Sequence, residues 1–219
     1  MPKYTKNGYD FAFGIENKDD TIKGLEVALM YNQNKDFKGV AIAPQNYSTS
    51  AQGVQLGWEN KVKEGKYLLQ TGGTNYAEKI DGVEAALLWN IAEIVRGAQA
   101  ALFYNQAKDV RGIQLAGLNR SEKVRGVQAG GISEADDLVG GQISAINRAK
   151  KMRGLDLYLM SLGGQLGVWN ELDDGEDMKQ IGVYNHAKKY SGWQFGGLNN
   201  VDDGVGLQAG VTNYAEKYS

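Results

Sequence analysis

Apolar residues alternate with polar or small residues along short segments that recur throughout the chain. Gly53–Asn60 reads GVQLGWEN, Gly112–Asn119 reads GIQLAGLN and Gly192–Asn199 reads GWQFGGLN. In each segment apolar side chains follow the opening glycine at every second position. A period of two over seven to nine residues predicts a β-strand, because successive side chains of a strand point to opposite faces.

These segments belong to a repeat of 14 or 15 residues anchored by asparagine. The anchors are Asn17, Asn32, Asn46, Asn60, Asn75, Asn90, Asn105, Asn119, Asn147, Asn170, Asn185, Asn199 and Asn213, with Ser133 and Ser161 taking the place of asparagine. The step from Ser161 to Asn170 is only nine residues, so the interpretation gives fifteen repeats. Self-similarity at a fixed period indicates a repeat architecture.

Each repeat has a second segment, from the anchor to the next opening glycine, with a different composition. Examples are YAEKID, RSEKVR and ELDDGED, which are rich in charge, Asn, Asp and Gly. Such residues are typical of turns, and five residues cannot carry a stable helix. We therefore expect one all-β domain over residues 1–219, with one strand per repeat and a turn between strands.

Two architectures fit such a repeat: an antiparallel meander and a parallel β-solenoid. The nine-residue step favours the meander, because a short step tightens a hairpin but would remove a side from a solenoid coil. The residue six beyond the anchor is basic in five of the seven even-numbered turns, at Lys38, Lys66, Arg96, Arg125 and Arg153, and in the odd-numbered turns only at Lys23 and Arg111. Such a two-repeat period favours the meander, because successive turns of a meander lie at opposite ends of the sheet and the two ends can differ in composition.

We therefore expect about fifteen strands in an antiparallel meander. Its exposed edges favour closure into a β-barrel, and a β-solenoid is the alternative. A barrel of that size encloses an aqueous lumen, which a polar face would line. The residues predicted for that face are Gln55, Gln99, Gln114, Gln128, Gln142, Gln165, Gln194 and Gln208. The apolar face would then contact a lipid bilayer, with Tyr and Trp at the strand ends.

Composition limits the chemistry. Lys and Arg number 24 against 26 Asp and Glu, and a net charge of −2 argues against a nucleic-acid partner. The chain has no cysteine, and His186 is its only histidine. The acidic stretch 171–177 lacks the spacing of a calcium loop, so we expect at most weak divalent binding there. We expect no catalytic residue, no cofactor and no resident metal.

Three stretches carry a resemblance to a known group of proteins: GVQLGWEN, VRGIQLAGLNRSEKVRGVQAGG and GLQAGVTNYAEKYS. They resemble the repeats of bacterial surface-repeat proteins, the kind first named in Leptospira. The resemblance implies the bacterial outer membrane or cell surface, with any leader absent from this chain, and it implies no activity or cofactor. The expected function is a structural or pore-like transmembrane barrel. The alternative is a soluble β-repeat scaffold for protein or surface interaction, with an unknown surface or self-association partner.

Overall fold

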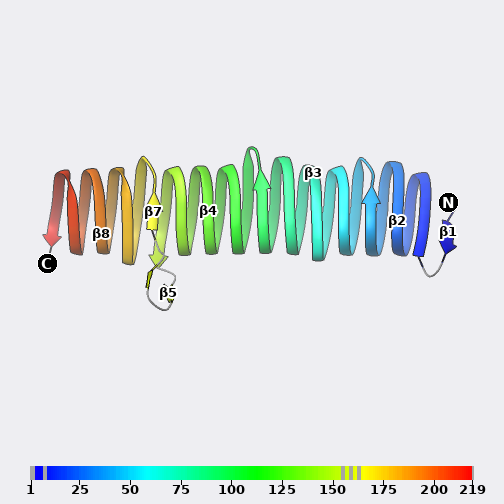
Figure 1. The fold of residues 1–219 in the computed structure, drawn as a ribbon, viewed down its shortest axis with the longest axis horizontal. Coiled ribbons are helices and arrows are strands. Elements are labelled where there is room, and N and C mark those ends of the chain that lie inside the picture. The colour runs from blue at the N-terminus through cyan, green and yellow to red at the C-terminus, as the bar shows by residue number, and fades with distance from the viewer. Residues whose placement is uncertain (1–2, 7–8, 154–155, 158–159, 162–163, 219) are drawn as a thin grey trace. The chain divides into compact units, whose positions relative to one another are not determined.

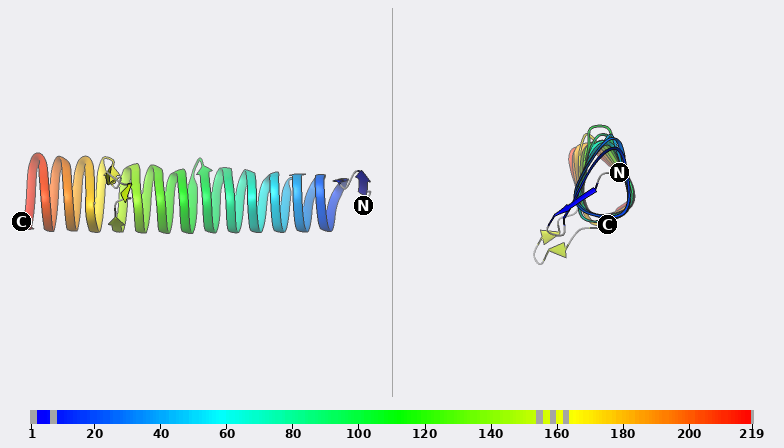
Figure 2. Two further views of the ribbon diagram at one scale, coloured as in Figure 1. Left: turned by 60° about the horizontal axis from the view of Figure 1, so that its bottom comes forward. Right: turned by 90° about the vertical axis from the view of Figure 1, so that its right-hand side faces the viewer.

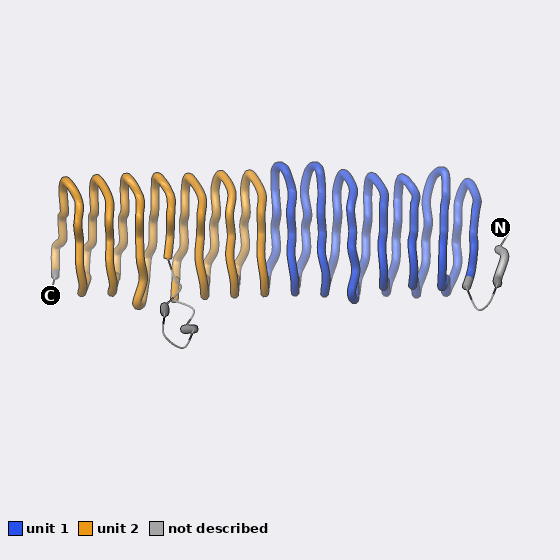
Figure 3. Tube along the Cα trace, in the orientation of Figure 1, with its two compact units in different colours: residues 1–108 blue, residues 109–219 orange. Residues whose placement is uncertain are grey.

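The structure is a computed structural model that describes residues 3–6, 9–153, 156–157, 160–161 and 164–218. The chain forms two compact units, residues 1–108 (unit 1) and 109–219 (unit 2), coloured separately in Figure 3 and described one at a time. The single domain expected over residues 1–219 stays a prediction. The strands are β1 (Lys3–Lys6), β2 (Tyr9–Ile42), β3 (Gln45–Ala101), β4 (Tyr104–Arg153), β5 (Asp156–Leu157), β6 (Met160–Ser161), β7 (Gly164–Leu166) and β8 (Trp169–Tyr218).

Equivalent positions of successive repeats pair in parallel. In unit 1, β2 pairs with β3 so that Asn32 lies beside Asn46, and in unit 2, β4 pairs with β8 so that Asn147 lies beside Asn170. Each repeat is therefore one coil of a β-solenoid, and the ribbon winds coil upon coil within each unit (Figures 1 and 2). The predicted antiparallel meander and β-barrel are wrong, and the solenoid alternative describes both units. Among the described residues, antiparallel pairing is confined to β1 with β2 and β5 with β6.

The nine-residue step was misinterpreted. The pairing of β4 with β7 and β8 joins Asn147 directly to Asn170, which is 23 residues away. That spacing is a regular 14-residue coil plus an insertion of nine residues, 154–162, so Ser161 is not an anchor. Because the insertion lies between two paired coils, it does not disturb their register, and the argument for a hairpin meander fails.

Charges that alternate between repeats are also compatible with a solenoid. Stacked coils place equivalent residues about 4.8 Å apart, so identical charges at one position would repel each other. At the position three residues beyond the anchor, opposite charges of successive coils pair: Lys35 lies 2.8 Å from Asp20 in unit 1, and Lys150 lies 2.8 Å from Asp136 in unit 2. The position six residues beyond the anchor does not alternate strictly, since it carries Lys23 and Lys38 in successive coils of unit 1 and Arg111 and Arg125 in successive coils of unit 2. A two-repeat period is therefore consistent with parallel stacking.

The opening glycines form one corner of each coil. Gly53 has a φ of 119°, and a Cβ built there would lie only 2.1 Å from the carbonyl oxygen of Gly39 in the coil below. Asp10 holds this position in the coil before Gly24, and two further coils replace the glycine with Leu68 and Met178. There the positive φ moves to the preceding residue, Tyr67 (48°) or Asp177 (51°), and the second segment is one residue longer.

The second segments, predicted as turns, are extended strand and supply the aliphatic part of the core. Their buried side chains stack at one position, namely Ile22, Ile80 and Val95 in unit 1 and Val110, Val124, Leu138 and Met152 in unit 2. The corners do not interrupt the hydrogen-bonded ladder, which is why β3 extends over 57 residues. In the described part of the chain no helix has the length and apolar character to cross a membrane.

Candidate functional site

The anchor asparagines form a ladder in the interior of each unit. In unit 1 the Nδ2 atom of Asn32 donates to Oδ1 of Asn46 at 3.0 Å and to the backbone carbonyl of Ile42 at 3.3 Å. In unit 2, Asn170 bonds in the same way to Asn185 at 2.7 Å and to the carbonyl of Ile181 at 3.0 Å. These side chains are fully buried, so the anchors hold successive coils together.

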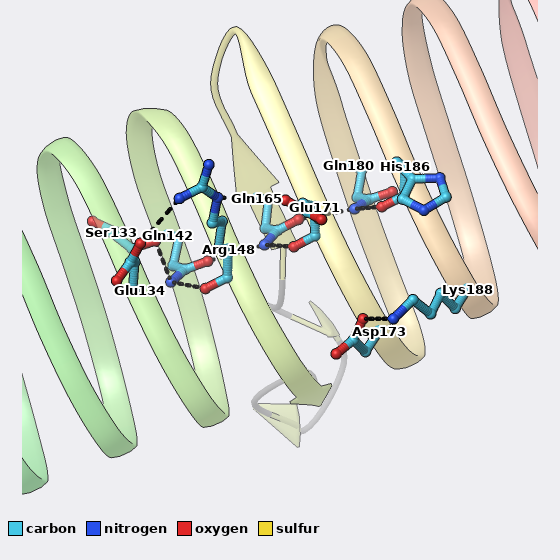
Figure 4. A network of polar contacts seen from close by, with 10 residues as sticks. All are labelled: Ser133, Glu134, Gln142, Arg148, Gln165, Glu171, Asp173, Gln180, His186 and Lys188. Atoms are coloured by element: carbon cyan, nitrogen blue, oxygen red, sulfur yellow. Dashed lines mark hydrogen bonds and ion pairs between the residues drawn. The ribbon is translucent and has the colours of Figure 1, made fainter.

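The glutamines predicted for the polar face also lie inside the coils. Gln208 is half-buried and Gln165 is 1% exposed. The others are fully buried, namely Gln55, Gln99, Gln114, Gln128, Gln142 and Gln194. Since there is no barrel, they line no aqueous lumen. Figure 4 shows their arrangement in unit 2, where Nε2 of Gln165 donates to Oε1 of Gln142 at 3.0 Å and, across the coil, to the carbonyl of Glu171 at 3.1 Å.

Two members of this series escaped the sequence interpretation. Gln70 donates to Gln55 at 2.8 Å, and Gln180 donates to Gln165 at 2.8 Å, and both are fully buried. They follow Leu68 and Met178 rather than an opening glycine. Both lie five residues before the anchor, as every predicted glutamine except Gln99 does, and this spacing was the signal that could have identified them.

Glu84 takes the place of glutamine in the unit 1 series. Gly82 stacks on Leu68, so Glu84 follows Gln70 in the ladder, and Gln99 donates to its Oε2 at 2.6 Å. Within the described residues, Oε1 of Glu84 and Oε1 of Gln70 are both buried without a hydrogen-bond partner. Burial raises the pKa of Glu84 to about 7, against the opposing effect of the Gln99 hydrogen bond. A protonated carboxyl would carry a donor, as the amides at this position of the other coils do.

The outward side chains of the first segments form a surface of exposed apolar residues, which we call the apolar face of each unit. In unit 2 it comprises Ile113, Leu115, Ile143, Leu166, Val168, Trp169, Ile181, Val183, Trp193, Leu198, Leu207 and Val211. In unit 1 it comprises Leu29, Met30, Ile42, Trp58, Leu69, Val83, Leu87, Trp89, Leu102 and Phe103. Exposure is substantial: Val183 is 63% and Leu29 is 75% exposed.

Charge is almost absent from the apolar face of unit 2. Its first segments, 112–118, 126–132, 140–146, 164–169, 178–184, 192–198 and 206–212, contain one charged residue, Lys179. The Nζ of Lys179 lies 6.0 Å from the ring centroid of Trp193, a cation–π geometry. The second segments hold the other charges of these coils, so each coil has an apolar side and a charged side.

Aromatic rings gather where the apolar face meets the anchors. The rings of Trp169 and Tyr184 lie on neighbouring coils with their centroids 4.3 Å apart. In unit 1, Nε1 of Trp89 donates to the hydroxyl of Tyr76 at 3.0 Å. Rings that were expected to lie at strand ends therefore pack along the solenoid axis of each unit, and their outer surfaces remain available to a partner.

The candidate chemical groups are engaged in structural contacts. In the acidic stretch, Glu171 lies 3.4 Å from Arg148, and Asp173 lies 2.9 Å from Lys188 (Figure 4). The His186 ring stacks near Tyr184, and the backbone carbonyl of His186 accepts a hydrogen bond from Gln180, while the buried Nδ1 has no hydrogen-bond partner among the described residues. Over the residues that the structure describes, no three His, Asp or Glu side chains gather in a way that could hold a metal ion.

Comparisons with protein-family models, curated proteins and solved structures found no match for this chain. The resemblance to Leptospira-type surface repeats therefore stays a prediction that rests on the repeat itself.

Proposed function

We propose that the chain is a non-enzymatic β-solenoid scaffold that binds a partner through its apolar face. The observation that carries this proposal is the near absence of charge from a surface of large exposed apolar side chains in unit 2. Monomeric soluble proteins rarely expose contiguous apolar patches larger than a few hundred Å², and larger patches mark interaction sites. Covering such a face removes apolar surface from water, which favours association.

The partner surface must be uncharged where it meets this face. A charged group buried against Ile181 or Val183 would lose its hydration without finding an opposite charge, because Lys179 is the one charged residue of the unit 2 first segments. The charged sides of the coils are less suited to binding, since their exposed ion pairs already neutralise one another.

The non-enzymatic character of the scaffold is also a proposal. Its support is that buried amides such as Gln165 and Asn170 bond along the ladders and to backbone carbonyls. A location at the bacterial outer membrane or cell surface is proposed from the repeat resemblance. Protease treatment of intact source cells tests it, because a surface protein is cleaved while cytosolic markers survive.

The binding proposal is tested with one substitution made at two places. Ile181→Lys puts a charge on the apolar face, where Ile181 is 47% exposed. Ile94→Lys makes the same change on a second segment, where Ile94 is 37% exposed, and serves as the matched control. Each full-length variant and the unsubstituted chain are assayed for self-association, for flotation with neutral phosphatidylcholine vesicles and for pelleting with microcrystalline cellulose.

We expect at least one of these three interactions in the unsubstituted chain, lost in Ile181→Lys and kept in Ile94→Lys. Circular dichroism confirms that both variants keep the fold. If the unsubstituted chain shows none of the three interactions, or if both substitutions weaken an interaction equally, the apolar face is not a binding surface.

A further inference from the structure

We propose that the apolar face of unit 2 binds the same face of a second copy of this chain, related by a two-fold axis. This inference rests on the proposed function and names its partner. Two-fold dimers are the commonest soluble oligomers, and their interface is one self-complementary patch.

The size of the face matches a stable dimer interface. The first segments of unit 2 are about seven residues long, which is about 23 Å at about 3.3 Å per residue. Its seven coils rise by about 4.8 Å each, so the face measures on the order of 800 Å². A standard specific interface buries about 800 Å² on each partner. Homodimer interfaces are also more apolar than other interfaces, as this face is.

The repeat of the face favours another copy over an irregular protein. Every coil presents outward side chains at the same spacing, as Ile143 and Leu166 show: these two residues are paired between β4 and β7. A second copy has the same spacing, so ridges and grooves that fit at one coil fit at the others. In unit 2 the inner face is covered by the amide ladder and the aliphatic core, and the outer face is open.

The charge distribution of unit 2 favours a second copy over a lipid surface as the partner. Proteins that lie on membranes carry a polar side rich in Lys and Arg, which attracts anionic lipid. In unit 2 the second segments alternate in sign instead. The position four residues beyond the anchor reads Asp109, Lys123, Asp137, Lys151, Asp174, Lys189 and Asp203 in successive coils; Asp109 and Asp137 are half-buried and the others are exposed. Such alternation gives no net positive surface at that position, and the whole chain carries −2.

Sedimentation velocity of the full chain without detergent, from about 1 to 100 µM, tests the proposal. We expect a dimer whose dissociation constant rises about tenfold or more in Ile181→Lys, since central interface residues dominate binding. Ile143→Lys, at the equivalent position of another coil, is expected to act in the same way and replaces Ile181→Lys if that variant does not fold. Ile94→Lys is expected to sediment like the unsubstituted chain.

Three other results would overturn the proposed dimer. A chain that is monomeric at 100 µM, a dimer unaffected by Ile181→Lys and Ile143→Lys, or open-ended assemblies larger than a dimer would all contradict it. If the monomeric chain floats with phosphatidylcholine vesicles and Ile181→Lys does not, lipid is the partner. The binding proposal then stands while the second copy is rejected.

Discussion

At the scale of single residues, the interior depends on the self-complementarity of amides. In-register stacking places each side chain beside the equivalent one of the next coil, so a buried polar group must be able to bond to its own kind. An amide does so because it carries both a donor and an acceptor, as in the 2.8 Å bond from Gln70 to Gln55. An ionised carboxylate has only acceptors, so the buried carboxyls of Glu26 and Glu84 depart from this rule, and burial raises the pKa of Glu84 to about 7.

Glu84→Gln is expected to remove a pH dependence of stability. The pKa of Glu84 is about 7 in the fold against 4.5 for the ordinary group, so the folded state binds more protons between these values. Stability from this site is therefore complete below about pH 4.5 and is lost as pH rises through about 7, by about 3 kcal/mol. Urea unfolding at pH 5 and pH 8 should show the glutamine variant gaining stability over the unsubstituted chain chiefly at pH 8.

The control for this measurement is Glu78→Gln, which changes an exposed carboxyl of the neighbouring second segment. It should leave the pH dependence as it was. An equal gain from both variants, or a gain from Glu84→Gln at pH 5 alone, would show that Glu84 is not protonated in the fold.

Asn75→Ala is expected to cost about 3 kcal/mol of unfolding free energy. Asn75 accepts a hydrogen bond from Asn60 at 2.8 Å and donates to Asn90 at 2.8 Å and to the carbonyl of Ala85 at 3.0 Å. Alanine leaves those buried partners unsatisfied, at about 1–3 kcal/mol each before relaxation. Gln106→Ala, at an exposed position, should cost less than about 1 kcal/mol in the same urea titration. Similar costs for the two variants would mean that the ladder contributes little.

At the scale of elements, the sequence predicted the extended segments correctly but not whether neighbouring strands run parallel or antiparallel. Alternation after Gly53 or Gly192 correctly predicts extended segments, because it reports which side chains share a face. Direction depends on which repeats are neighbours, and the 23 residues from Asn147 to Asn170 allow two interpretations: a short extra repeat or an insertion in one coil. Only the pairing of Asn147 with Asn170 decides between them, since local periodicity is the same in both.

Deletion of residues 154–162 is expected to leave the solenoid intact. It joins Arg153 to Gly163 and brings Asn147 and Asn170 to the 14-residue spacing seen between Asn185 and Asn199. Because the coils on either side are already paired, the melting temperature should change by no more than about 3 °C. Deleting nine residues from a regular coil, 126–134, removes buried Gln128 and Ser133 and should prevent cooperative unfolding. If deletion of 126–134 were tolerated and deletion of 154–162 prevented cooperative unfolding, residues 154–162 would be part of a regular repeat and not an insertion.

At the scale of the whole molecule, both compact units repeat one arrangement, with amides inside and apolar side chains outside. The sequence shows two unlike faces, but a period of two cannot say whether the polar face meets water or protein. A lumen and a packed interior both accept Gln at positions such as 114 and 128. The hydrogen bond of 2.9 Å between these two side chains, on adjacent coils, shows that the interior is packed.

The most direct test of this account is whether Lys151 and Asp174 are neighbours. They are exposed Cα partners of β4 and β8, on either side of the insertion, and the chain has no cysteine of its own. Adjacent strands lie about 4.8 Å apart, within the range of Cα distances that a disulfide spans. Under mild oxidation the Lys151→Cys/Asp174→Cys variant should form an intramolecular disulfide nearly completely, as measured by mass spectrometry of the unreduced digest. The Lys151→Cys/Lys189→Cys variant, whose sites lie two coils or about 9.6 Å apart, should not. Absence of the first disulfide, or equal formation of both, would contradict parallel in-register stacking.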